Sequence, residues 1–204
     1  MTSAVQPADQ ARYDARTIVG SGVKLGIVTT VGVVVFALLS RAIGGTTEVV
    51  AQSILVLLGG LVFSFLAAMW LKPHDVDSIA WTALVGLLGA LTFTVLDTAI
   101  LRPLNLYHWT WDQIGGGSGF WYIPVWWMGA ATLAWLGAWI YSLASRGATV
   151  GFGTLAGRPV VIALALFVVL GLTRIGPFTA AMMALAFCLA LVVEVVLASV
   201  LPRK

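Results

Sequence analysis

Residues 159–201 read PVVIALALFVVLGLTRIGPFTAAMMALAFCLALVVEVVLASVL and contain two long apolar runs. The runs, about 159–175 and 177–201, are joined by the short turn Arg174-Ile175-Gly176-Pro177. About 20 apolar residues suffice for a helix to cross roughly 30 Å of hydrocarbon. The stretch therefore predicts a hairpin of two transmembrane helices. We expect Pro159 and Pro177 in the first turns of these helices, where a missing N–H costs no hydrogen bond.

Four further apolar runs precede this hairpin, at about 23–43, 49–71, 79–101 and 121–145. The sequence thus predicts an all-α, polytopic membrane protein with six transmembrane helices. We expect a single transmembrane domain over 21–204 after a cytoplasmic tail over 1–20. Composition agrees: of 204 residues, 60% are hydrophobic and only 9% are charged. Because a soluble domain carries about 25% charged residues, this composition excludes a soluble fold.

The basic residues predict the orientation. With the N-terminus inside, eight basic residues fall on the cytoplasmic side: Arg12, Arg16, Lys24, Lys72, Arg146, Arg158, Arg203 and Lys204. Only Arg41, Arg102 and Arg174 then fall outside. Cytoplasmic loops carry the excess of Lys and Arg, so both ends are predicted to be cytoplasmic. In such a protein the net charge of +3 reports orientation and does not indicate nucleic-acid binding.

Aromatic residues concentrate between Tyr107 and Tyr141, and most of them fit an interfacial belt of indole and phenol rings. Within this region Gly116-Gly117-Ser118-Gly119 matches the motif of rhomboid intramembrane proteases. A serine nucleophile needs a base within hydrogen-bond reach, which rhomboid proteases supply as a histidine from a later helix. No histidine follows His108 in this chain. The glycines are therefore interpreted as a flexible loop, and no catalytic residue is predicted.

Metal and cofactor chemistry find no support in the sequence. His74 and His108 fall in loops predicted on opposite sides of the membrane, so they cannot share a haem or another metal. A single cysteine, Cys188, excludes a multi-cysteine site and an internal disulfide. We therefore predict no cofactor, no metal and no enzymatic activity.

Two carboxylates inside predicted helices are the candidate functional groups, because ionisable residues are costly in a membrane. Asp97 lies close to the outer end of its helix, with Arg102 near enough for an ion pair. Glu194 lies near the inner end of the last helix. No basic residue falls inside a predicted span beside Glu194, so a neutral carboxyl group is expected there. Small residues such as Gly86, Ala130 and Ala134 predict close packing of the third and fourth helices.

Two local motifs resemble the Insig (insulin-induced gene protein) family of six-helix membrane proteins. Between the second and third helices, Lys72-Pro73-His74 precedes Trp81, as a Pro-His pair precedes a tryptophan in the family. At the end of the fourth helix, Trp139, Ser145 and Arg146 match the family in order, and Gly151-Phe152-Gly153 follows. The family's partner-binding aspartate is replaced by Leu143. The resemblance implies binding of a sterol-like lipid. The chain is rich in Ala, Val and Gly and has more Arg than Lys, a composition typical of a bacterium, so we expect a bacterial relative of the family.

We expect a lipid-binding membrane protein of the bacterial inner membrane, with a sterol-like or diacylglycerol-like ligand among the first four helices. The predicted contacts are Thr94 and Asp97 for the head group and Trp126, Trp127 and Trp135 for the walls. Thr94 lies one helical turn before Asp97 on the same face. Two alternatives remain open: a small-solute or proton-coupled transporter that uses Asp97 and Glu194, and an accessory subunit that docks through its tryptophan-rich loop.

Overall fold

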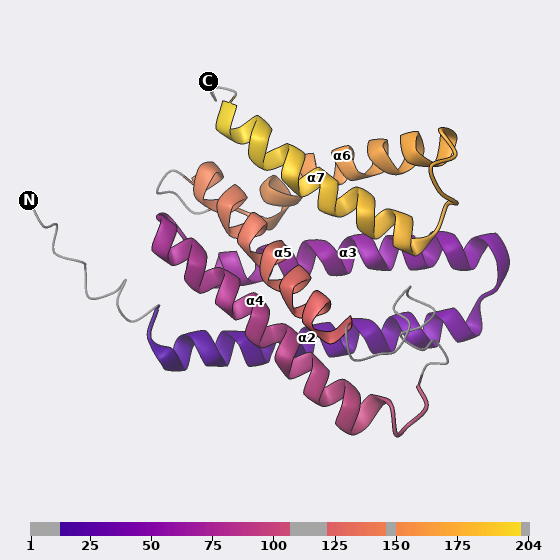
Figure 1. Ribbon diagram of the computed structural model, residues 1–204, viewed down its shortest axis with the longest axis horizontal. Helices are drawn as coiled ribbons and strands as arrows, with labels where there is room; N and C mark the ends of the chain where they lie inside the picture. Colours follow the sequence, from indigo (N-terminus) through magenta and orange to yellow (C-terminus); the bar gives the residue numbers. More distant parts are fainter. Residues whose placement is uncertain (1–12, 107–121, 146–149, 201–204) are drawn as a thin grey trace, which may run out of the picture.

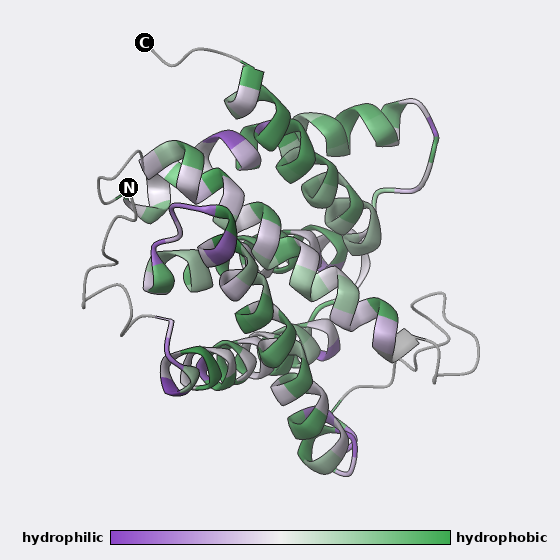
Figure 2. Ribbon diagram, turned by 60° about the vertical axis from the view of Figure 1, so that its left-hand side comes forward, coloured by the Kyte–Doolittle hydropathy of each residue, from purple (hydrophilic) through white to green (hydrophobic). Residues whose placement is uncertain are grey.

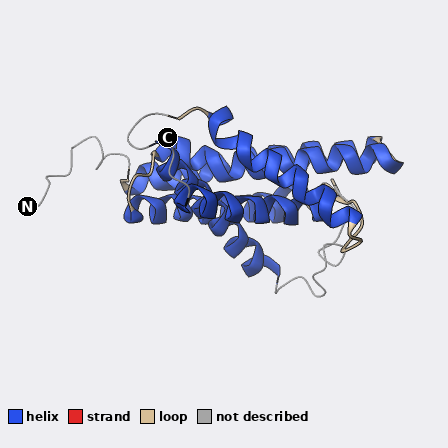
Figure 3. Ribbon diagram, turned by 90° about the horizontal axis from the view of Figure 1, so that it is seen from above, coloured by secondary structure: helices blue, strands red, loops and turns tan. Residues whose placement is uncertain are grey.

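The computed structural model describes residues 13–106, 122–145 and 150–200, and all regular structure in those ranges is helical (Figures 1 and 3). The α-helices are α2 (Ala15–Ala42), α3 (Gly45–Leu71), α4 (Val76–Leu96), α5 (Tyr122–Ser145), α6 (Phe152–Leu172) and α7 (Ala180–Val200). A π-helical turn, η1 (Asp97–Leu101), continues α4. The predicted all-α class is confirmed, and each of the six apolar runs forms a helix.

Within the described residues, five helical segments are long and apolar enough to cross a membrane: α2, α3, α4 with η1, α6 and α7. Large apolar side chains lie on the outside of the molecule, for example Val161 at 67% and Leu172 at 73% exposure. In Figure 2, hydrophobic residues make up most of the length of the helices. These features indicate a multi-pass membrane protein. The sixth span, α5, and the predicted orientation remain predictions.

The helices run alternately between two ends of the molecule (Figure 1). One end holds the start of α2 and the end of α7, and is called the terminal end below. The opposite end holds the α2–α3 and α6–α7 connections, and is called the hairpin end. The start of α2 and the end of α7 therefore lie at the same end of the molecule.

Helix α4 packs against both α2 and α5 at glycine contacts. A Cβ atom on Gly86 would lie 2.4 Å from the Cβ of Ala134 and 2.9 Å from the carbonyl oxygen of Ala130. This confirms the predicted close approach of the third and fourth helices through small residues. On the other side, a Cβ on Gly26 of α2 would lie 2.7 Å from the carbonyl oxygen of Gly89.

Helices α3 and α5 also cross closely. A Cβ on Gly137 of α5 would lie 2.0 Å from the carbonyl oxygen of Ser64 on α3. Helix α7 packs against α3, α5 and α6, whereas α6 meets the rest of the bundle mainly through α7. The larger core cluster includes Phe65, Tyr141 and Phe187, which are buried between these helices.

Several predicted helix boundaries are wrong. Helix α2 begins at Ala15 and not near residue 23. The reason is that the Asp14 side chain accepts a hydrogen bond from the Thr17 amide and caps the helix. The first turns of α2 therefore lie in the segment predicted as a tail. Helix α6 begins at Phe152, which places Pro159 inside the helix and not in its first turn. Pro177 precedes the first residue of α7.

Candidate functional site

Asp97 lies where α4 gives way to the π-helical turn at the hairpin end. The Arg102 amide donates to the Asp97 carbonyl at 2.9 Å, the five-residue spacing of a π-helix. The Arg102 Nε also donates to Asp97 Oδ2 at 2.9 Å. Only 2% of the Asp97 side chain is exposed, against 41% for Arg102. The ion pair expected from the sequence is therefore present, and it holds a buried carboxylate to a half-exposed guanidinium.

The second carboxylate oxygen of Asp97 differs from the first. Asp97 Oδ1 is buried and has no hydrogen-bond partner among the described residues. A buried acceptor without a donor loses its hydration without replacement, at a cost of about 1–3 kcal/mol. A buried polar atom without a partner requires an explanation. A bound molecule that donates a hydrogen bond to Asp97 Oδ1 would provide one.

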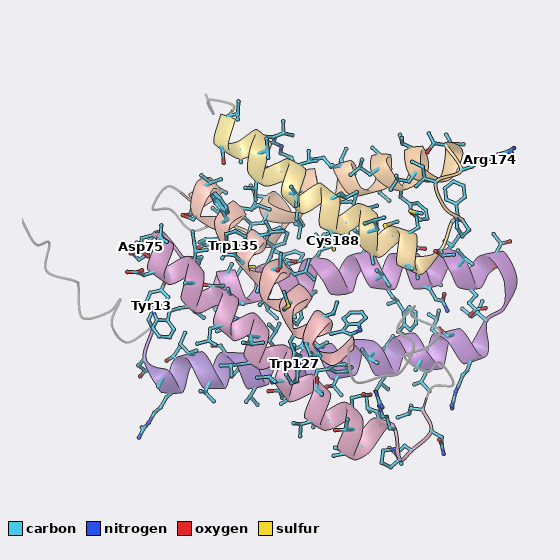
Figure 4. The ribbon with its side chains drawn as sticks, viewed as in Figure 1. Tyr13, Asp75, Trp127, Trp135, Arg174 and Cys188 are labelled. Atoms are coloured by element: carbon cyan, nitrogen blue, oxygen red, sulfur yellow. The ribbon has the colours of Figure 1, made fainter. Side chains whose placement is uncertain are left out.

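Thr94 and Trp127 meet one helical turn from Asp97. The Trp127 Nε1 on α5 donates to Thr94 Oγ1 on α4 at 3.1 Å. The Thr94 hydroxyl itself donates to the Ala90 carbonyl at 2.9 Å. Trp127 is half-buried, and Figure 4 shows it beside α4. The structure thus joins two predicted site residues directly, with the third, Asp97, further along the same helix.

The other two predicted wall residues do not join this group. Trp126 and Trp135 are nine positions apart on α5, so they project from opposite sides of a helix with 3.6 residues per turn. Both are exposed, at 47% and 42%. Trp135 packs against Trp139, with ring centroids 5.4 Å apart. The sequence analysis grouped these tryptophans because they lie deeper in their predicted helix than an interfacial belt needs, whereas the helix places them on different sides.

Glu194 has a basic partner, contrary to the prediction. The Arg158 Nη1 lies 3.3 Å from Glu194 Oε1, and the glutamate side chain is 2% exposed. Because α6 begins at Phe152, Arg158 lies within the helix that packs against α7 and not in the preceding loop. Glu194 and Asp97 therefore lie toward opposite ends of the molecule, each held by an arginine.

The motif residues between the second and third helices form a structured connection at the terminal end. Lys72 adopts a left-handed conformation, with φ of 54°, and ends α3. Asp75 caps α4, because its Oδ1 accepts the Ser78 amide at 2.8 Å. The hydrogen bonds from the Ser78 side chain and backbone hold the pKa of Asp75 below its usual value. Tyr13 closes the connection by donating to the Leu71 carbonyl at 2.9 Å, a contact that the sequence analysis missed.

Other chemistry-bearing residues are dispersed. Over residues 13–106, 122–145 and 150–200, no three His, Cys, Asp or Glu side chains gather as metal ligands would. His74 is exposed, with Nε2 3.9 Å from Asp75 Oδ2. Cys188 is exposed on α7 (Figure 4). His108, Ser118 and the tryptophan-rich loop lie outside the described residues.

The residues near Asp97 combine a buried, arginine-paired carboxylate with a tryptophan that is hydrogen-bonded to the same helical segment. Sequence reasoning named Thr94 and Trp127, which the structure joins by a hydrogen bond, and Asp97, but it missed the Arg158–Glu194 pair. The signal for that pair was an arginine directly before one apolar run and a glutamate near the end of the next. Comparison with protein-family models, curated proteins and solved structures finds no match to this chain.

Proposed function

We propose that this chain is a non-catalytic lipid-binding protein of the bacterial inner membrane, with the lipid head group held at Asp97. The observation that carries the proposal is the buried Asp97 Oδ1, which lacks a donor among the described residues. A ligand head group would supply that donor. The proposed occupant is a sterol-like or diacylglycerol-like lipid among α2–α5, in keeping with the resemblance to the Insig family.

The depth of Asp97 supports a head-group role. The residue lies four positions before the end of the helical segment at Leu101, about 6 Å at 1.5 Å per residue. A lipid lies in a membrane with its head near this depth and its apolar part toward the middle. The half-buried Trp127 beside Thr94 adds a rigid aromatic surface at the same level.

The carboxylate pairs also bear on the transport alternative. A coupling carboxylate in a transporter usually lies near the membrane midplane, where both sides can reach it in turn. Asp97 and Glu194 lie toward opposite ends, and each is ion-paired to an arginine on or next to the helices. This arrangement favours two fixed structural pairs over one shared pathway, so we do not propose transport.

The test is the amount of lipid that stays bound after purification. Native mass spectrometry of the purified wild type should detect a lipid near one per chain. Asp97→Ala should lower that amount several-fold, because the anchoring acceptor is lost. The matched control is Glu194→Ala, which removes an equally buried carboxylate from an arginine pair at the other end.

Equal lipid content in the wild type and in Asp97→Ala would refute the assignment of the head group to Asp97. An equal loss in Glu194→Ala would show that the loss reflects a weakened fold. A wild type that carries no lipid under mild purification would refute the proposed function itself.

A further inference from the structure

We propose that the Asp97 site selects lipids whose head is uncharged and donates a hydrogen bond, such as a primary alcohol or a primary amide. This inference rests on the proposed function and adds the chemical class of the ligand. It follows from how the polar groups around Asp97 are already used.

Hydroxyl donors near Asp97 are committed to the backbone. Thr94 Oγ1 donates to the Ala90 carbonyl at 2.9 Å, and Thr98 Oγ1 donates to the Thr94 carbonyl at 2.8 Å. The indole N–H of Trp127 is committed to Thr94 Oγ1. A hydroxyl carries one proton, so neither threonine can donate to Asp97 Oδ1 without breaking its present bond.

What remains is a site that accepts hydrogen bonds. Asp97 Oδ1 has its full accepting capacity, and Thr94 Oγ1 keeps one further lone pair. An ether or ester oxygen in this position would face the carboxylate oxygen with no proton between them. A hydroxyl or amide N–H would instead give Oδ1 the donor that it lacks.

Charge sets the second condition. Asp97 and Arg102 together are electrically neutral, with 2.9 Å between Arg102 Nε and Asp97 Oδ2. An anionic head placed at Oδ1 would add a second negative charge next to a buried carboxylate. Charges interact more strongly and are less well solvated in the low dielectric of a protein interior, so this arrangement is unfavourable. A cationic head would lie beside the guanidinium that already balances Asp97.

The experiment compares four lipids with one oleyl chain and different heads: oleyl alcohol, oleamide, oleyl methyl ether and oleate. Each is titrated into the delipidated full-length protein in one nonionic detergent, and binding is followed by native mass spectrometry. We expect the alcohol and the amide to bind at least about tenfold more tightly than the methyl ether. Oleate should bind no better than the ether.

Asp97→Asn tests the charge condition with nearly the same side-chain shape. The amide keeps a carbonyl acceptor but removes the negative charge, and Arg102 stays cationic. We therefore expect oleate to gain at least about tenfold in affinity relative to the alcohol. Thr98→Val is the control, because Thr98 is exposed and donates to backbone carbonyls, and it should leave the order of the four lipids unchanged.

The outcomes separate this inference from the proposed function. Equal affinity of the wild type for the alcohol and the methyl ether would overturn the donor requirement. Continued rejection of oleate by Asp97→Asn would overturn the role of charge. Continued rejection of oleate is compatible with a neutral lipid bound at Asp97. Equal binding of the ether would also remove the head group from Asp97, but would leave lipid binding among α2–α5 standing. Failure to bind any of the four, with no lipid retained from cells, would refute the proposed function.

Discussion

Replacing Gly137 by alanine tests the crossing of α3 and α5. The new Cβ would lie 2.0 Å from the carbonyl oxygen of Ser64, and real Cβ atoms essentially never approach closer than 3.0 Å. The two helices must therefore separate locally by about 1 Å, since 3.0 minus 2.0 is 1.0. Because the obstacle is backbone and not a flexible side chain, it cannot move aside alone. Overpacking of this kind costs about 1–3 kcal/mol.

The matched control lies on the same helix. Gly129 of α5 has no atom within 4 Å of the position where a Cβ would be placed. Gly129→Ala should therefore be neutral, or stabilise the helix by up to about 1 kcal/mol through its higher helix propensity. Both variants would be unfolded by titration with sodium dodecyl sulfate from mild detergent micelles, with circular dichroism as the readout. The reasoning would be refuted if Gly137→Ala were as stable as Gly129→Ala.

Three further predictions concern the ends of the molecule. Asp75→Ala should lower stability by less than about 1 kcal/mol, because the carboxylate caps α4 but is 57% exposed. The pKa of Asp75 is lower in the folded protein than its unfolded value of 3.8. The stabilisation by the cap is therefore present above pH 3.8 and is lost as the pH falls through the lower folded pKa. Thermal unfolding of the wild type and Asp75→Ala at about pH 6 and about pH 3 checks this. Arg158→Met and Glu194→Met should show coupling of about 1 kcal/mol in a double-mutant cycle, whereas purely additive effects would contradict the observed pair. In a Cys188→Ala background, an impermeant maleimide added to intact cells should label Ile175→Cys at the hairpin end and not Val76→Cys at the terminal end. Both positions are accessible, at 69% and 82% exposure. The reverse labelling would overturn the predicted orientation.

The number and type of the helices could be predicted from the sequence because each apolar run is long enough to specify a helix without reference to its neighbours. The boundaries depended on weaker local signals. Asp14 adds a side-chain cap that extends α2 toward the N-terminus, and no hydropathy pattern reveals it. Pro159 suggested a helix start, yet a proline is tolerated within a membrane helix where neighbours satisfy the freed backbone.

The candidate site was predictable in part. Asp97 stood out as a carboxylate in an apolar run, and the spacing to Thr94 and Arg102 gave its helical neighbours. Contacts between helices were harder to predict, because they depend on how each helix is rotated about its axis. Trp127 faces Thr94 while Trp126, the next residue along α5, is exposed, and the sequence assigned both to one wall.

The pairing of α2 with α4 has a consequence for how the chain assembles. Two of the glycine-mediated contacts join helices that are not neighbours in the sequence: α2 with α4, and α3 with α5. A ribosome delivers helices to the membrane in chain order, so the contacts of α2 with α4 can form only after α4 has been inserted. Until then Gly22 and Gly26 lack the residues that they pack against in the folded chain, Leu88 and Thr92. A substitution at either glycine should thus delay maturation of the chain as well as weaken the finished bundle.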